Sequence, residues 1–170
     1  MVNIQDQVAR ATKKLIFTEP FYGLFLIGIN KQYSKRISTA GVSKKGIGMQ
    51  LTINPEFFNE LSEDHRFGLI KHELLHIAFG HLLLRDLYSN HKLFNIAADL
   101  EINQYILESK LPDGGLLLSS FPELKLPIKA GTKKYYEILE QAQEDGTSPS
   151  LDNLMNQMDG ESQYCHSTWE

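Results

Sequence analysis

Hydrophobic spacing divides the first third of the chain into helical and extended segments. Apolar residues recur at helical spacing in residues 3–17, which predicts an amphipathic helix ended by Pro20. Residues 21–29 are a short, aromatic-rich apolar run between glycines, a pattern typical of a buried strand. Residues 47–53 alternate apolar with small or polar side chains, which predicts a half-buried strand. The polar, basic segment 31–45 predicts a hairpin or an exposed strand.

The rest of the chain has mainly helical periodicity. Ser62 followed by two acids predicts a helix start, and the apolar spacing continues to about Leu87. A second helix covers about residues 93–108, and Thr132 caps a third that Gly146 ends. We therefore predict an α+β fold, mostly helical, with a small mixed or antiparallel sheet.

Length and composition limit the class of protein. The chain has 170 residues, 42% of them hydrophobic, which suits one folded domain and argues against a disordered chain. We place this domain at residues 1–146, and the polar segment 147–170 is expected to lead into a further domain. Cys165 is the single cysteine, which excludes an internal disulfide framework and an all-cysteine zinc site.

Charge and hydropathy narrow the expected partners and compartment. A formal net charge of −4 provides no long-range attraction to nucleic acid or to an anionic membrane. The N-terminus has no secretory pattern, and the longest apolar run is far short of the roughly 20 residues that span a bilayer. We therefore expect a cytoplasmic protein. A role for the lysines of residues 31–45 in binding nucleic acid is disfavoured, because few aromatic residues lie among them.

The sequence His72-Glu73-Leu74-Leu75-His76 suggests metal chemistry. Residues four apart on a helix are offset by only about 40°, so both imidazoles can face one ion. Zinc accepts imidazole nitrogens, and the intervening glutamate can take a proton from an activated water. This is the spacing of zinc metallopeptidases. The alternative is a pair of hydrogen-bonded core histidines with a surface glutamate.

A zinc site of this kind needs a third protein ligand, and the next predicted helix offers Asp99. Asn95, Asp99 and Asn103 form one polar stripe among apolar neighbours, and a carboxylate there favours a facing cation. The two asparagines would be hydrogen-bonding neighbours. Asp99 could instead cap or bridge a helix end.

His81 is the rival third ligand. It follows His72 by nine residues, about 180° around a continuous helix, and would face away unless Gly80 breaks the helix. A role in orienting a ligand is an equal possibility. Glu101 is a weaker candidate, and His65 and His91 are expected at the surface.

The segment Ile70–His81, followed by Arg85, Asn95–Asp99 and Ile102-Asn103, resembles a bacterial and phage metallopeptidase domain family. Members often precede a von Willebrand A-like domain. Similar segments are 51–57, 135–139 and His166–Trp169. The resemblance implies a zincin-like fold with one zinc ion, and a von Willebrand A-like domain that this chain lacks.

These observations predict zinc-dependent hydrolysis of a peptide or protein substrate, with Glu73 activating the water. An extended substrate is expected to pair with an edge of the strand at residues 47–53. The alternative function is a non-catalytic, zinc-containing docking or regulatory module. The terminal Cys165-His166-Ser167-Thr168-Trp169 is a poor metal signal by itself.

Overall fold

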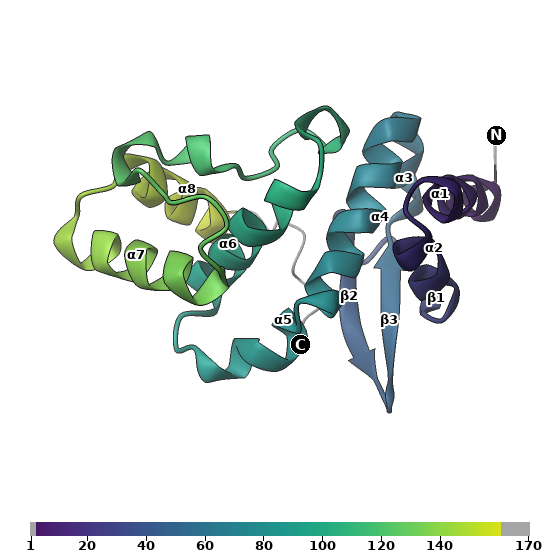
Figure 1. Cartoon of the computed structure of the whole chain (residues 1–170), viewed down its shortest axis with the longest axis horizontal. Helices are drawn as coiled ribbons and strands as arrows, with labels where there is room; N and C mark the ends of the chain where they lie inside the picture. The colour runs from purple at the N-terminus through teal and green to yellow at the C-terminus, as the bar shows by residue number, and fades with distance from the viewer. Residues whose placement is uncertain (1–2, 161–170) are drawn as a thin grey trace.

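The computed structural model describes residues 3–160, and their fold is α+β as predicted. Helices cover both ends of the molecule, and a small sheet lies against α4 (Figure 1). The helices are α1 (Ile4–Thr18), α2 (Pro20–Ile27), α3 (Pro55–Glu60), α4 (Glu63–Ala78), α5 (His81–Leu84), α6 (His91–Ile102), α7 (Thr132–Asp145) and α8 (Pro149–Gly160). The strands are β1 (Asn30–Tyr33), β2 (Ala40–Lys45) and β3 (Gly48–Ile53).

The sheet is mixed, with strand order β1-β3-β2. β1 runs parallel to β3, and β2 pairs antiparallel with β3 through a tight turn at Gly46, whose φ is 59°. The predicted strand at residues 47–53 is therefore confirmed as β3, but it is the central strand. Both of its edges are hydrogen-bonded, so the expectation that a substrate pairs with it is wrong. The outer strands are β1 and β2.

Residues 21–29 were expected to form a strand, and the structure corrects this to the helix α2. A short apolar run does not distinguish a buried strand from a helix. Pro20 suits the first turn of a helix, where its missing N–H costs no hydrogen bond. Gly23 lets α2 approach α1 closely, because a Cβ there would lie 2.5 Å from the backbone nitrogen of Ile16. Packing against α1 thus favours the helix.

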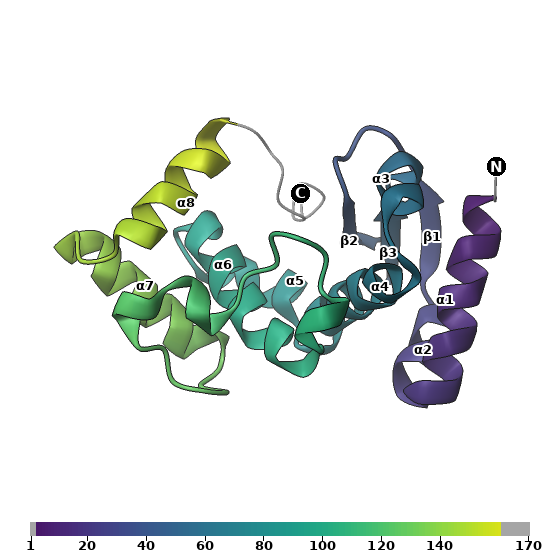
Figure 2. The same cartoon turned by 90° about the horizontal axis from the view of Figure 1, so that it is seen from above.

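Two apolar clusters form the core, and α4 and α6 lie where they meet (Figure 2). One cluster joins α1 and α2 to the sheet and to α4 through residues such as Leu15, Leu51 and Ile70. The other joins α6 to α7 and α8. A smaller cluster, which includes Leu75 of α4 and Ile102 of α6, links the two. Side chains on the facing sides of α4 and α6 are therefore held by both cores.

The chain after α6 returns to α4 at a close backbone contact. A Cβ on Gly68 would lie 1.8 Å from the carbonyl oxygen of Lys110, so only glycine allows this approach. The contact brings the turn at residues 112–115 beside α4. Among residues 3–160, no helix is both long and apolar enough to cross a membrane.

Candidate metal centre

α4 presents the two histidines of the motif as its spacing predicts. The Ser62 hydroxyl accepts a hydrogen bond from the His65 N–H and caps the helix, and Glu63 and Asp64 lie in its first turn. His72 and His76 are buried one turn apart, and their Nε2 atoms are 3.0 Å from each other. The helix therefore directs two imidazole nitrogens at one point.

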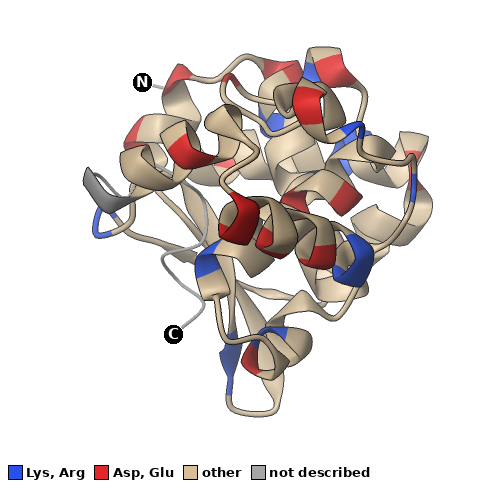
Figure 3. Cartoon of the chain, turned by 90° about the vertical axis from the view of Figure 1, so that its left-hand side faces the viewer, with Lys and Arg blue, Asp and Glu red and all other residues tan. Residues whose placement is uncertain are grey.

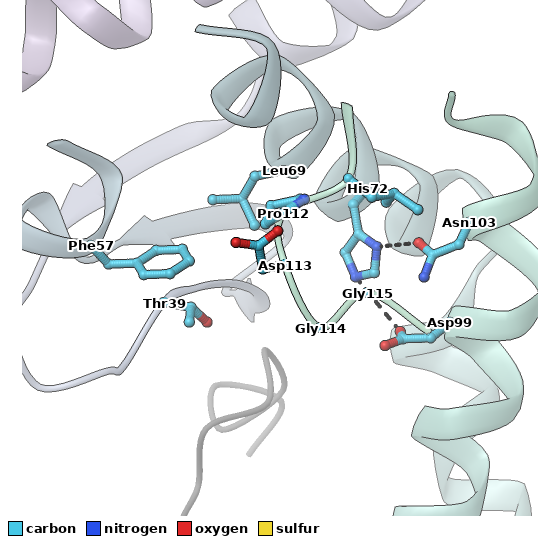
Figure 4. A pocket seen from close by; sticks show the side chains of 11 residues that line it. Thr39, Phe57, Leu69, His72, Asp99, Asn103, Pro112, Asp113, Gly114 and Gly115 are labelled. Carbon is cyan, nitrogen blue, oxygen red and sulfur yellow. Dashed lines mark hydrogen bonds and ion pairs between the residues drawn. The ribbon is translucent and has the colours of Figure 1, made fainter. Parts of the chain in front are cut away.

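Asp99 of α6 completes this group. Its Oδ1 atom lies 3.2 Å from His76 Nε2 and 3.6 Å from His72 Nε2. All three residues are buried, and Figure 4 shows the Asp99 carboxylate approaching the His72 ring. The described residues contain one cluster of histidine, cysteine and carboxylate groups that could hold a metal ion, and it consists of His72, His76 and Asp99.

The spacing of these donor atoms suits zinc. Four ligand atoms at about 2.0–2.1 Å from a tetrahedral ion lie roughly 3.3–3.4 Å from one another. The separations of 3.0, 3.2 and 3.6 Å in this cluster bracket that value. Two neutral imidazoles and one carboxylate are also a donor set that zinc accepts, with a fourth position left for water. The side chains therefore fit the expected ion.

Asn103 orients the His72 ring through its Nδ1 atom. Its Nδ1 atom lies 2.8 Å from Asn103 Oδ1, and the Asn103 amide donates to the Leu116 carbonyl oxygen over 2.8 Å. An acceptor at Nδ1 favours the tautomer that carries its proton there and leaves Nε2 open to a metal. The expectation that Asn103 is a hydrogen-bonding neighbour is confirmed.

Asn95, the other expected neighbour, is buried without such a role. Its Oδ1 atom has no hydrogen-bond partner among residues 3–160. It lies one turn before Asp99 on α6. In the polar stripe, Asp99 and Asn103 thus contact the histidines, whereas Asn95 does not hydrogen bond to them.

His81 reaches the site because the predicted long helix is interrupted. α4 ends at Ala78, and Gly80 adopts a left-handed conformation with φ 71° before the short helix α5 begins. This corrects the prediction of one helix to Leu87 that would turn His81 away. The His81 Nδ1 atom lies 2.8 Å from His76 Nδ1. Since the Nε2 atom of His76 faces Asp99, His81 contacts the opposite side of the ring and lies outside the donor cluster.

The far side of His81 contacts the start of α7. Its Nε2 atom is 2.9 Å from the Thr132 hydroxyl oxygen. Thr132 was predicted to cap α7, but Gly131 occupies the N-cap position and Thr132 is the first helical residue. The Thr132 hydroxyl therefore contacts a histidine instead of capping the helix.

The remaining candidates lie outside the cluster. Glu101 is buried, and its carboxylate accepts a hydrogen bond from the Gly131 N–H over 2.9 Å, which gives it a structural role before α7. His91 is exposed and His65 is half-buried at the start of α4. The Cys165–Trp169 segment lies outside the described residues.

Glu73 is completely buried on α4, next to His72 in the sequence. A surface position for this glutamate, as in the alternative with two core histidines, is therefore excluded. A buried carboxylate is costly unless neighbouring groups compensate it, so its place in the interior points to a specific role.

A pocket of about 180 Å³ opens beside His72 and Asp99 (Figure 4). Its other walls come from segments far apart in the sequence: Thr39 before β2, Phe57 of α3, Leu69 of α4 and the turn from Pro112 to Gly115. The sequence Pro112-Asp113-Gly114-Gly115 is typical of a turn, but no local pattern links this turn to the site. The close contact between Gly68 and Lys110 holds the chain just before this turn against α4.

Two lysines of the basic segment 31–45 make local contacts. The Lys31 ammonium donates to the carbonyl oxygens of Leu26 and Ile29, and burial lowers its pKa. Lys35 pairs with Glu56 of α3. On the face seen in Figure 3, lysine and arginine are scattered among acidic residues.

Comparison with known proteins identifies one family. The family described as “Putative metallopeptidase domain” matches the chain over residues 3–166, which includes α4, α6 and the donor cluster. No curated protein and no solved structure matches the chain.

Proposed function

Because the chain belongs to the family described as a putative metallopeptidase domain, we propose that it hydrolyses peptide bonds with one bound zinc ion. The observation that supports this most strongly is the convergence of the His72, His76 and Asp99 donor atoms within 4.8 Å of one another. The substrate is a peptide or protein that enters the pocket beside His72 and Asp99.

His72, His76 and Asp99 would hold the zinc. Asn103 and His81 contact the Nδ1 atoms of the two histidines, which keeps each Nε2 atom directed at the ion. When bound, the ion supplies Lewis-acid polarisation of the scissile carbonyl and acidifies a water molecule. The donor atoms lie on α4 and α6, and each helix is packed in an apolar core. Little movement of either helix is therefore needed when the ion binds.

Glu73 is the general base and then the general acid in this proposal. Its carboxylate accepts one proton from the water as the water oxygen attacks the carbonyl carbon. It then donates that proton to the amide nitrogen as the C–N bond breaks, and a carboxylic acid and an amine leave. Glu73 is completely buried, and on α4 it directly follows the proposed ligand His72.

The test combines metal analysis with hydrolysis of a mixed peptide library. We expect one equivalent of zinc in the purified protein and loss of that zinc in Asp99→Ala. Glu73→Gln should retain zinc while hydrolysis falls by about 10²- to 10⁴-fold, the usual contribution of a general base. The matched control is Glu63→Gln, the same change at an exposed position of α4, which should leave both unchanged.

Two results would contradict the proposal in different ways. Zinc binding without hydrolysis of any peptide would favour a non-catalytic docking or regulatory module. Full hydrolysis by Glu73→Gln would exclude Glu73 as the base.

A further inference from the structure

The pocket beside the donor cluster has an apolar wall and an acidic rim. Phe57, Leu69 and Leu111 provide apolar surface, and Leu69 and Leu111 are buried. Asp113 lines the same pocket, and in the view of Figure 4 its carboxylate lies between the rings of Phe57 and His72. A side chain entering here would meet apolar surface and a carboxylate together.

The turn from Pro112 to Gly115 presents Asp113 to the pocket. The Gly115 N–H donates to the Pro112 carbonyl oxygen over 3.1 Å, and Gly114 has a φ of 87°, which suits the third position of a type II turn. Asp113 therefore occupies the second position, where the side chain projects from the turn. The nearby contact between Gly68 and Lys110 holds this turn against α4.

The charges around the pocket are not balanced. Asp99 and Asp113 are its two carboxylates, and no lysine or arginine lines it in the part of the chain that the structure describes. Asp113 is exposed and has no ion pair or hydrogen bond with residues 3–160. In the proposed function, a divalent ion at the donor cluster would be balanced by the carboxylates of its ligand Asp99 and of the general base Glu73. Asp113 would then be the remaining uncompensated charge.

From this arrangement we infer that Asp113 selects peptides with a lysine or arginine side chain next to the cleaved bond. The inference rests on the proposed function and names the substrate class of the same site. The aliphatic stem of such a side chain packs against Phe57, Leu69 and Leu111, and its cationic group reaches the Asp113 carboxylate. An acidic side chain at this position is repelled.

A binding experiment tests this without requiring turnover. Nα-acetyl-lysine hydroxamate and Nα-acetyl-norleucine hydroxamate carry the same zinc-chelating group and differ in the terminal charge of the side chain. Calorimetry on the zinc-loaded protein should show the lysine compound binding about two- to fivefold more tightly, as an ion pair with an exposed carboxylate provides. Asp113→Asn should remove this preference, and Asp113→Lys should reverse it.

The control is Asp152→Asn, the same change at an exposed position of α8, which should keep the preference for the lysine compound. Equal binding of both compounds by the unaltered protein would overturn this inference but not the proposed function. If neither compound bound to protein shown to contain zinc, the inference would also be overturned. A protein that failed to take up zinc would refute the metal centre, and with it the proposed function.

Cleavage provides a second, independent measurement. Mass spectrometry of a digested peptide library should show lysine and arginine enriched next to cleaved bonds, and Asp113→Lys should shift the enrichment to aspartate and glutamate. Cleavage with the same residue frequencies in all variants would support the proposed function and refute the role of Asp113.

Discussion

His81 Nδ1 lies 2.8 Å from Nδ1 of His76, although a continuous helix would have placed these side chains on different faces. Gly80, with φ 71°, turns the chain back so that His81 contacts the ring nitrogen of His76 that faces away from Asp99. His81 therefore positions a proposed metal ligand and contacts the start of α7 through Thr132.

Replacing His81 with alanine should weaken zinc binding by about 10- to 100-fold, the usual effect of losing a group that orients a metal ligand. Competition with a chromophoric chelator measures the affinity. Thr132→Ala removes only the outer contact and should have a smaller effect. Complete loss of zinc in His81→Ala, equal to that in His76→Ala, would instead make His81 a ligand.

Asn103→Ala should both weaken zinc binding and destabilise the fold. It removes the partner of His72 Nδ1 and leaves the Leu116 carbonyl oxygen without its donor, which costs about 1–3 kcal/mol. Urea unfolding with metal removed measures the second effect separately. Asn95→Ala is the matched control, since Asn95 is buried on α6, which ends just before Asn103, but its Oδ1 has no partner among the described residues. Equal losses in the two variants would contradict the role given to Asn103.

Gly68→Ala should destabilise the protein by about 1–3 kcal/mol, the cost of overpacking a close contact. The added Cβ would lie 1.8 Å from the Lys110 carbonyl oxygen, so the chain that carries the turn at residues 112–115 must move. Urea midpoints give the stability, and hydroxamate affinity reports the change at the pocket. Gly28→Ala, whose Cβ would meet its nearest neighbour at 3.5 Å, should change both much less.

Removing zinc should lower the stability of the unaltered protein. Zinc at about a thousand times its dissociation constant adds about 4 kcal/mol to the free energy of unfolding. Thermal unfolding with and without chelator measures this difference, and Asp99→Asn should abolish it. An identical melting temperature in both conditions would refute a zinc site in the folded protein.

Stability in acid should depend on Glu123. Its carboxylate accepts hydrogen bonds from the Ser148 hydroxyl over 2.6 Å and from the Ser150 N–H over 3.1 Å, at the start of α8. The Ser148 hydrogen bond is the main cause that lowers the pKa of Glu123. A lowered pKa in the folded state contributes stability above the unfolded pKa, and this contribution is lost as pH falls through the folded value.

Glu123→Gln should therefore be less stable than the unaltered protein at pH 7, and the difference should shrink below about pH 4. Urea unfolding at the two pH values measures the change. Glu144→Gln, at an exposed position of α7, is the control and should show no such pH-dependent difference. A difference that grew in acid would contradict this account.

Much of the donor cluster could be predicted from local spacing. The positions of His72 and His76 relative to each other follow from the helical repeat alone, and a carboxylate in a polar stripe on an otherwise apolar helix pointed to Asp99. The helical conformation of α2, in place of the expected strand, could not be predicted, because a short apolar run packs equally well as strand or helix until its neighbour is known. The prediction that β3 offers a free edge was wrong for a similar reason, since strand order depends on partners distant in sequence.

By itself, then, the sequence determined the residue types of the proposed metal centre and the helices that carry them, because both depend on short-range periodicity. Tertiary structure alone decided that His81 returns behind His76 and that Asp113 reaches the pocket. The first depends on Gly80, whose positive φ changes the direction of the backbone. The second depends on Gly68, which allows a close contact with Lys110. Such effects leave no periodic pattern in the chain.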